Sequence, residues 1–146
     1  MKRLTMALLA MILCLVSASV WTPLVLSQGN YVYDLILEWG GYGDHDGHFS
    51  RPSGIAVDSF GNVYVADTGN WRIQKFTSTG VFITKWGSYG SGDGQFGGGG
   101  PRGPAGVAVS QDGYVYVTDP RDWLDNRVHK FDSNGVFITK WAVQTD

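Results

Sequence analysis

The sequence predicts an all-β fold built from a repeated unit, and two observations carry that prediction. Residues 80–86, Gly-Val-Phe-Ile-Thr-Lys-Trp, recur unchanged as residues 135–141, 55 positions further along the 146-residue chain. The heptad is rich in β-branched and aromatic residues and opens on a turn-forming glycine, so the repeated unit contains strands. Beyond the N-terminal segment, apolar residues alternate over short runs and rarely recur at helical spacing.

The N-terminal segment, residues 1–27, is predicted to be a secretory signal peptide. It joins a positive head to an apolar run and then to small residues. Cleavage is expected after Ala18, Ser19 or Ser27, which would give a secreted or otherwise extracytoplasmic protein. The alternative is an uncleaved membrane anchor formed by residues 4–26, which are about long enough to cross a bilayer.

Cysteine content and charge exclude several kinds of function. The single cysteine, Cys14, lies in the N-terminal segment, so the remaining chain offers neither a disulfide nor a thiol catalyst. Removal of Lys2 and Arg3 with that segment lowers the basic residues from 11 to 9 against 13 acidic ones, a net charge of −4. This balance gives no electrostatic basis for binding a phosphate backbone, so we expect no nucleic-acid partner.

Residues 28–146 form the predicted repeat domain, which begins with an isolated strand. Residues 35–39, Leu-Ile-Leu-Glu-Trp, align with the end of the heptad at residues 82–86. They are predicted to be the last strand of a unit whose first three strands are absent from the chain.

The first complete unit is expected at about residues 40–86. A loop rich in Gly, Asp and His precedes four short strands with turns between them, at residues 55–58, 63–67, 72–76 and 81–86. A single sheet of this kind has apolar residues on both faces, so they are expected to pack against a neighbouring sheet. These residues are Ile55, Val57, Val63 and Val65.

The second unit, at about residues 87–141, repeats this order. Phe49 corresponds to Phe96, Val63 to Val115 and Arg72 to Arg127, at offsets of 47, 52 and 55. The growing offset marks a five-residue insertion near residues 97–101 and a three-residue insertion within residues 119–126. Both insertions fall in loops, where extra residues cost little.

Four short strands per unit and a period near 50 residues are typical of the antiparallel blades of a β-propeller. The sequence therefore predicts two full blades in an incomplete ring. Two blades alone leave unpaired edges and bare apolar faces. We weigh three outcomes: a truncated gene product, which the isolated strand favours; a homo-oligomer, for instance three chains forming six blades; or an open array.

The motifs of both units resemble the NHL-repeat family of β-propellers. The family pattern is, roughly, Gly-Gln-Phe, Pro-x-Gly-Ile-Ala-Val-Asp, Gly-Asn-Val-Tyr-Val-Ala-Asp and Asn-x-Arg-Ile. Its elements are matched by residues 93–96, 52–58, 61–67 and 70–74. The resemblance extends from about residue 35 to residue 141 and implies a propeller of six blades, sometimes five.

An acidic residue ends the second strand of each unit, and an arginine begins the third. Asp67 with Arg72, and Asp119 with Arg127, can form charge-assisted hydrogen bonds that fix the intervening turn. A pair that recurs in every unit belongs to the scaffold more often than to a site, so we interpret both pairs as structural. The tryptophans that end the outer strands are expected to pack between blades: Trp39, Trp86 and Trp141.

Two further tryptophans, Trp71 and Trp123, lie in the loops between second and third strands. An aromatic side chain on such a loop can stack on a sugar or on another aromatic group. Together with Arg121, from a stretch found only in the second unit, they are the candidate ligand-binding residues. The alternative is a tryptophan folded back against the blade. His129, on a third strand, is expected at the surface.

The expected function is a secreted binding module for a protein, small molecule or carbohydrate, without catalytic residues or cofactor. The sequence has no Gly-x-Ser-x-Gly motif and no phosphate-binding glycine loop that opens a helix. The alternative is a fragment of a metal-dependent lyase, since peptidylglycine amidating lyase and streptogramin lyase are NHL-like propellers. A divalent metal would have only His45 and His48 as ligands worth testing. Their spacing fits neither a calcium loop nor a helical histidine pair, so we interpret residues 44–48 as a solvated turn.

Overall fold

The computed structural model describes residues 37–98, 102–120 and 126–142, all within one compact unit, Leu35–Asp146. The predicted signal segment lies outside the described residues, and so do Arg121 and Trp123. Within these ranges, no helix is long and apolar enough to cross a membrane.

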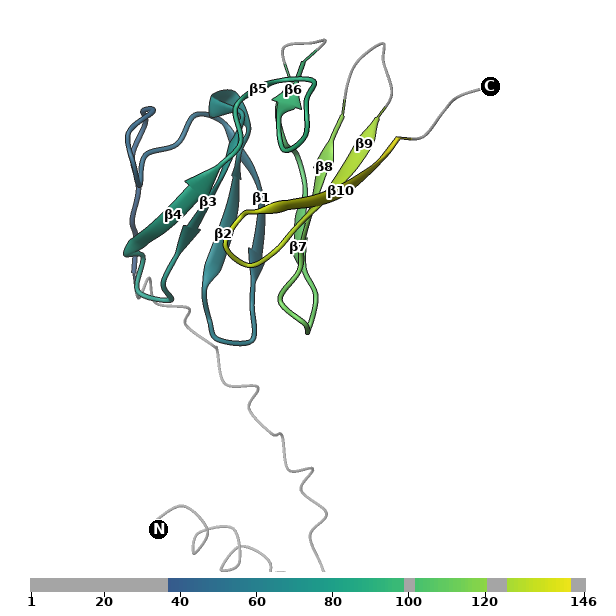
Figure 1. The fold of residues 1–146 in the computed structure, drawn as a ribbon. Coiled ribbons are helices and arrows are strands. Elements are labelled where there is room, and N and C mark those ends of the chain that lie inside the picture. Colours follow the sequence, from purple (N-terminus) through teal and green to yellow (C-terminus); the bar gives the residue numbers. More distant parts are fainter. Residues whose placement is uncertain (1–36, 99–101, 121–125, 143–146) are drawn as a thin grey trace, which may run out of the picture. The chain divides into compact units, whose positions relative to one another are not determined.

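The first repeat forms an antiparallel sheet of four strands in the order β1-β2-β3-β4 (Figure 1). Its strands are β1 (Pro52–Val57), β2 (Val63–Asp67), β3 (Arg72–Phe76) and β4 (Phe82–Trp86). Gly61, between β1 and β2, has a φ of +84°, which side chains with a Cβ rarely adopt. A short 3-10 helix, η2 (Thr68–Asn70), joins β2 to β3.

The second repeat forms a second sheet of the same kind, with its strands in the order β10-β9-β8-β7. They are β7 (Val107–Val109), β8 (Val115–Asp119), β9 (Arg127–Phe131) and β10 (Phe137–Ala142). Two antiparallel sheets of four strands each confirm the all-β, blade-like units that the sequence predicts.

The loops that precede the sheets repeat as well. Before the second sheet, β5 (Tyr89–Gly90) and β6 (Phe96–Gly97) pair in parallel at the top of Figure 1. Before the first sheet, a parallel bridge joins Tyr42 to Phe49, the counterparts of Tyr89 and Phe96. Each unit therefore begins with a loop folded back on its own sheet.

The isolated strand expected at residues 35–39 is different in the structure. Its described part, residues 37–39, belongs to no strand, because no strand in the described ranges pairs with it. Trp39 is held by packing instead, with its ring 6.4 Å from that of Phe76. The composition of this segment favours a strand, but residues 37–39 have no ladder partner among the described residues.

The main hydrophobic core lies between the facing sides of the two sheets. The first sheet contributes Tyr64, Ala66 and Ile73, each with 0% of its surface exposed. The second sheet and β6 contribute Phe96, Val115, Val117 and Phe131. Full burial of a large apolar side chain is worth about 1.5–3 kcal/mol, so this interface supplies much of the stability of both sheets.

The opposite side of the first sheet is only partly covered. Val63 and Val65 are 7% and 8% exposed, but Ile55 and Val57 are 66% and 59% exposed. The expectation that all four pack against a neighbouring sheet is therefore wrong: Val63 and Val65 are buried against Phe76 of their own sheet, and Ile55 and Val57 are exposed. Trp39 from the preceding segment, Phe49 from the loop and Phe82 from β4 pack against this side.

The two identical heptads occupy matching places at the outer edges of their sheets. Val81 and Val136, their second residues, are each 62% exposed. Their last residues differ: Trp86 packs against the main core, as expected for a tryptophan between blades, whereas Trp141 is 49% exposed. Identical sequence therefore meets two environments, and the difference falls on the tryptophan.

The glycine that opens each heptad is required twice over. Gly80 and Gly135 have φ values of +80° and +86°. A Cβ on Gly80 would lie 2.7 Å from the ring of Trp39, and a Cβ on Gly135 would lie 2.5 Å from the ring of Trp86. In both units the tryptophan from the preceding segment covers the glycine of the next turn, so the inter-unit contact repeats with the sequence.

Candidate functional site

The first buried polar centre of the structure is the Asp67 carboxylate, which is 0% exposed. Arg72 Nε donates to Asp67 Oδ2 at 2.7 Å, and the backbone N–H of Ser50 donates to Oδ1 at 2.7 Å. The side-chain amides of Asn70 and Gln74 donate to the same carboxylate at 2.9 and 3.0 Å. The carboxylate thus ties β2, η2, β3 and the preceding loop together.

The Arg72 guanidinium organises the loop that carries the candidate metal-binding histidines. Its Nη1 donates to the carbonyl of Asp44 at 2.7 Å, and its Nη2 donates to those of His45 and His48 at 2.9 Å each. The two imidazole rings lie 6.2 Å apart. Among the described residues, no group of three His, Cys, Asp or Glu side chains gathers in a way that could hold a metal ion.

The second repeat builds the same centre around Asp119. Arg127 Nη2 donates to Asp119 Oδ2 at 2.8 Å, and the N–H of Gly97 donates to Oδ1 at 2.9 Å. Arg127 also donates to the loop carbonyls of Ser91 and Gln95, at 2.7 and 3.3 Å. Each arginine thus links the aspartate of its own repeat to the loop that precedes the sheet in the sequence.

One residue of the second centre departs from the pattern. Gln74 of the first repeat is replaced by His129, which is 0% exposed and has no hydrogen-bond partner in the structure on either ring nitrogen. Its Nε2 lies 4.0 Å from Asp119 Oδ2, and its ring packs 5.3 Å from that of Phe96. Burial, with a contribution from Arg127, lowers the pKa of His129 to about 4. The surface position expected for His129 is wrong, because His129 lies on the buried face of β9, together with Arg127 and Phe131.

Trp71 is the only candidate ligand-binding residue within the described ranges. It adopts a left-handed φ of +52° after η2 and is partly buried at the edge of the main core. Its ring lies 5.3 Å from that of Tyr89, and a Cβ on Gly97 would meet it at 2.6 Å. The side chain is folded between the loops of the two units, the alternative that the sequence left open.

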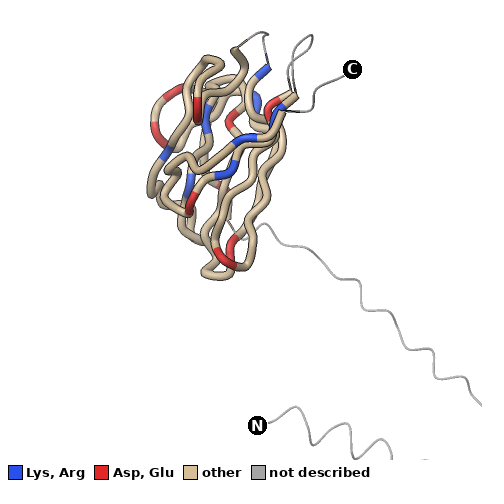
Figure 2. The backbone as a smooth tube through the Cα atoms, turned by 45° about the vertical axis from the view of Figure 1, so that its right-hand side comes forward, with Lys and Arg blue, Asp and Glu red and all other residues tan. Residues whose placement is uncertain are grey.

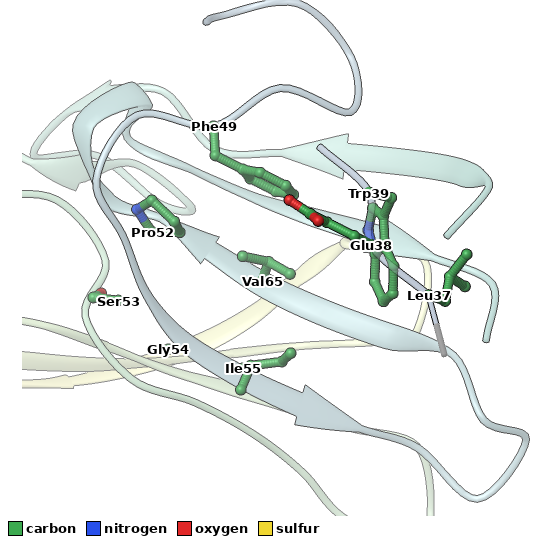
Figure 3. Close-up of a pocket in the computed structure, with 9 residues that line it drawn as sticks. All are labelled: Leu37, Glu38, Trp39, Phe49, Pro52, Ser53, Gly54, Ile55 and Val65. Atoms are coloured by element: carbon green, nitrogen blue, oxygen red, sulfur yellow. The ribbon is translucent and has the colours of Figure 1, made fainter. Parts of the chain in front are cut away.

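An open apolar pocket of about 480 Å³ lies on the uncovered side of the first sheet (Figure 3). Phe49, Val65 and Ile55 project from the loop, β2 and β1, and Leu37 and Trp39 lie along its side. Its remaining lining residues are Glu38, Pro52, Ser53 and Gly54. Sequence reasoning did not select this pocket as a site, although Ile55 and Val65 were marked as residues in need of a neighbouring sheet.

The charges of the described chain are of mixed sign. Acidic and basic residues are interspersed over the described backbone (Figure 2). Several are paired across each repeat: Lys85 with Asp46 at 2.6 Å, and its counterpart Lys140 with Asp93 at 2.9 Å.

Residues 49–76, from the loop through the end of β3, match the family described as NHL repeat. The chain belongs to the NHL-repeat family. The match covers the part of the first NHL unit that holds the Asp67 centre and the pocket residues of β1 and β2. The family resemblance predicted from the sequence motifs is therefore confirmed.

Several larger proteins are similar to this NHL chain over part of their length. Protein brain tumor of Drosophila melanogaster is 30% identical over 135 residues, covering 88% of this chain and 12% of that protein. E3 ubiquitin-protein ligase TRIM71 of Xenopus tropicalis is 49% identical over 49 residues, covering 34% of this chain and 6% of that protein. The chain thus spans a small fraction of the length of these relatives.

Among solved structures, the chain is similar to the PQQ-bound aldose sugar dehydrogenase of Streptomyces coelicolor. The two are 24% identical with a TM-score of 0.42, over 68% of this chain and 31% of that one.

Proposed function

We propose that this NHL chain is a non-catalytic binding module that takes a protein surface in the pocket of the first sheet. The counterparts of the pocket residues in the second sheet support this proposal. Phe49, Ile55 and Val65 correspond to Phe96, Val107 and Val117, which pack in the main core against the first sheet. The pocket is therefore lined by apolar residues whose counterparts in the second repeat pack against the surface of the first sheet.

The buried ionisable groups favour binding over catalysis. The Asp67 and Asp119 carboxylates are 0% exposed and accept hydrogen bonds from an arginine and from loop backbone. Charges used in this way hold loops in place, whereas a catalytic acid or base must reach a substrate. The apolar lining of the pocket supplies contact area with few polar groups, as the centre of a protein interface does.

We expect the pocket of the free chain to bind a small aromatic probe. N-acetyl-tyrosinamide is the appropriate choice, because Tyr64 packs against the matching surface of the second sheet. A ligand of this size should bind with a dissociation constant of roughly 1 mM. In a methyl NMR titration at low protein concentration, the signals of Ile55 and Val65 should shift.

Two variants make this titration decisive. Ile55→Asp should abolish the shifts, because it places a charge in the apolar pocket. Ile83→Asp is the matched control, since Ile83 is 44% exposed on β4 outside the pocket lining, and it should leave binding unchanged. Absence of shifts in the unmodified chain, or equal shifts in Ile55→Asp, would argue against the pocket as a binding site.

We also propose an extracytoplasmic location, on the basis of the signal-like pattern in residues 1–27. Expression in a secreting host should give a mature chain that begins at Ser19, Val20 or Gln28. N-terminal sequencing of the secreted and cell-bound fractions measures this directly. Recovery of the chain only inside the cell, with residues 1–27 retained, would contradict the proposal.

A further inference from the structure

The uncovered side of each sheet carries the residues that correspond to the covered side of the other sheet. The main core joins one side of the first sheet to the opposite side of the second. Each of the two remaining sides therefore corresponds to a side that is covered in the other sheet, but no sheet packs on it within the described residues. We name the uncovered side of the first sheet, with Ile55, Val57 and Val65, the pocket face. The uncovered side of the second, with Tyr116, Val128 and Trp141, is the Tyr116 face.

Matched residues show what each face lacks. On the Tyr116 face, Tyr116 and Val128 are partly exposed, whereas their counterparts Tyr64 and Ile73 are 0% exposed in the core. On the pocket face, Ile55 is 66% exposed, whereas its counterpart, Val107, packs against the core. Each face thus exposes positions that are buried or partly buried in the other repeat.

We propose that a second copy of this chain docks its Tyr116 face onto the pocket face, reproducing the interface between the two sheets. This inference rests on the proposed function, that the pocket face binds a protein surface. The same contact can continue from copy to copy, because each copy carries one face of each kind. Such a head-to-tail contact ends when the copies close a ring, and three copies would supply six blades.

The Tyr116 face carries the same kinds of aromatic and cationic groups as the covered sheet, in a different arrangement. The Trp141 ring stacks on Tyr116 at 6.3 Å with 15° between the planes, whereas Trp86 packs edge-on against Tyr64 at 6.2 Å with 72° between the planes. Lys130 Nζ lies 5.6 Å from the Tyr116 ring and 3.7 Å from that of Tyr114. Lys75 Nζ lies over the Tyr64 ring and donates to the carbonyl of Ser133 at 3.0 Å in the neighbouring sheet. By correspondence, Lys130 would donate to the carbonyl of Ser78 in the second copy.

Trp39 holds the place that an incoming Trp141 needs. Trp86 covers Phe131 and Gly135 of the next unit, and Trp39 covers the counterparts Phe76 and Gly80. Residues 37–39 belong to no strand, so Trp39 is held without ladder hydrogen bonds. Trp141 ends a heptad within the six-residue strand β10. Docking therefore exchanges a loosely held tryptophan for one that a full strand supports.

The contact between copies should be weaker than the contact within one chain. Between the two sheets of one chain, the Ser53 hydroxyl donates to the carbonyl of Ala105 at 2.8 Å, and the Thr68 hydroxyl donates to that of Pro104 at 2.7 Å. The residues that correspond to Ser53 and Thr68 on the Tyr116 side are Ala105 and Pro120, which carry no hydroxyl. Assembly is therefore expected to depend on concentration.

Two tryptophan variants with opposite expected effects test the proposal. We expect Trp141→Ala to weaken self-association by roughly thirtyfold, as loss of an aromatic anchor does, and Trp39→Ala to strengthen it by roughly tenfold. Sedimentation velocity across a concentration series gives the association constants. Val136→Ser is the matched control. Its counterpart, Val81, stays 62% exposed although Trp86 of the same heptad is covered by the second sheet, so Val136 should lie outside the contact between copies. It should change nothing.

Circular dichroism reports folding of each variant, and Trp39→Leu replaces Trp39→Ala if the latter unfolds. A monomer at all concentrations would overturn the proposal, as would a Trp141→Ala chain that associates normally. If the chain stays monomeric while N-acetyl-tyrosinamide binds the pocket, the second copy is the wrong partner and the binding module stands. If neither occurs, both proposals fail.

Discussion

Replacement of Asp67 by alanine is expected to lower the free energy of unfolding by about 3–5 kcal/mol, the effect of removing one partner of a buried ion pair. Arg72 is 6% exposed and would be left as an uncompensated charge. The donors of Ser50, Asn70 and Gln74 would lose their acceptor in the same step. Since small domains have roughly 5–15 kcal/mol in total, this loss removes a large share of the stability. Urea denaturation followed by circular dichroism measures the change.

The exposed pair of the same repeat is the control for this variant. Asp46→Ala removes a 2.6 Å contact with Lys85, but both side chains are nearly half exposed. An exposed ion pair is worth about 0–1 kcal/mol, so the stability of Asp46→Ala should stay close to that of the unmodified chain. A loss below about 1 kcal/mol in Asp67→Ala would contradict the structural role of the buried centre.

Acidification is expected to destabilise the second repeat through His129. The pKa of this imidazole is about 4 in the folded chain, against 6.5 in its unperturbed state. Unfolding therefore takes up a proton between these pH values, and the free energy of unfolding falls as the pH falls from 6.5 to 4. The total loss is on the order of 3 kcal/mol. Denaturation midpoints measured across this pH range report it.

His129→Gln provides the test of cause. In the first repeat, Gln74 Nε2 donates to Asp67 Oδ2 and to the carbonyl of His48, at 3.0 and 2.7 Å. The corresponding acceptors in the second repeat are Asp119 and the Gln95 carbonyl. The variant should remove most of the pH dependence between 4 and 6.5. An unchanged slope would assign the acid sensitivity to other groups.

The repeat architecture could be predicted from the sequence because it depends on local patterns. The unchanged heptad, the alternating strands and the turn glycines each specify a short element, and the structure places these elements in two matching sheets. The ion pair between Asp67 and Arg72 could be predicted because the two residues flank one tight turn. The use of their remaining hydrogen-bonding groups to hold a distant loop could not be predicted.

The environment of single side chains was harder to predict, because it depends on which sheet face has a neighbour. His129 was expected at the surface and is buried, since the loop holding Phe96 folds over it. Ile55 was expected to be covered and is exposed, since the next sheet packs on the opposite face. Trp86 and Trp141 end identical heptads but differ in burial, because a neighbouring sheet packs on the face that carries Trp86 and none of the described residues forms a sheet on the face that carries Trp141.

The docking of one copy on another can be observed most directly by an isotope-filtered NOE experiment. Labelled and unlabelled chains are mixed, and contacts between Trp141 of one chain and Gly80 of the other are sought. We predict an intermolecular NOE between these residues, because Trp86 lies against Gly135 in the interface that the contact should repeat. An NOE to Gly80 that arises only from Trp39 of the same chain, with none from Trp141 of the other at concentrations where the chain associates, would contradict the repeated interface.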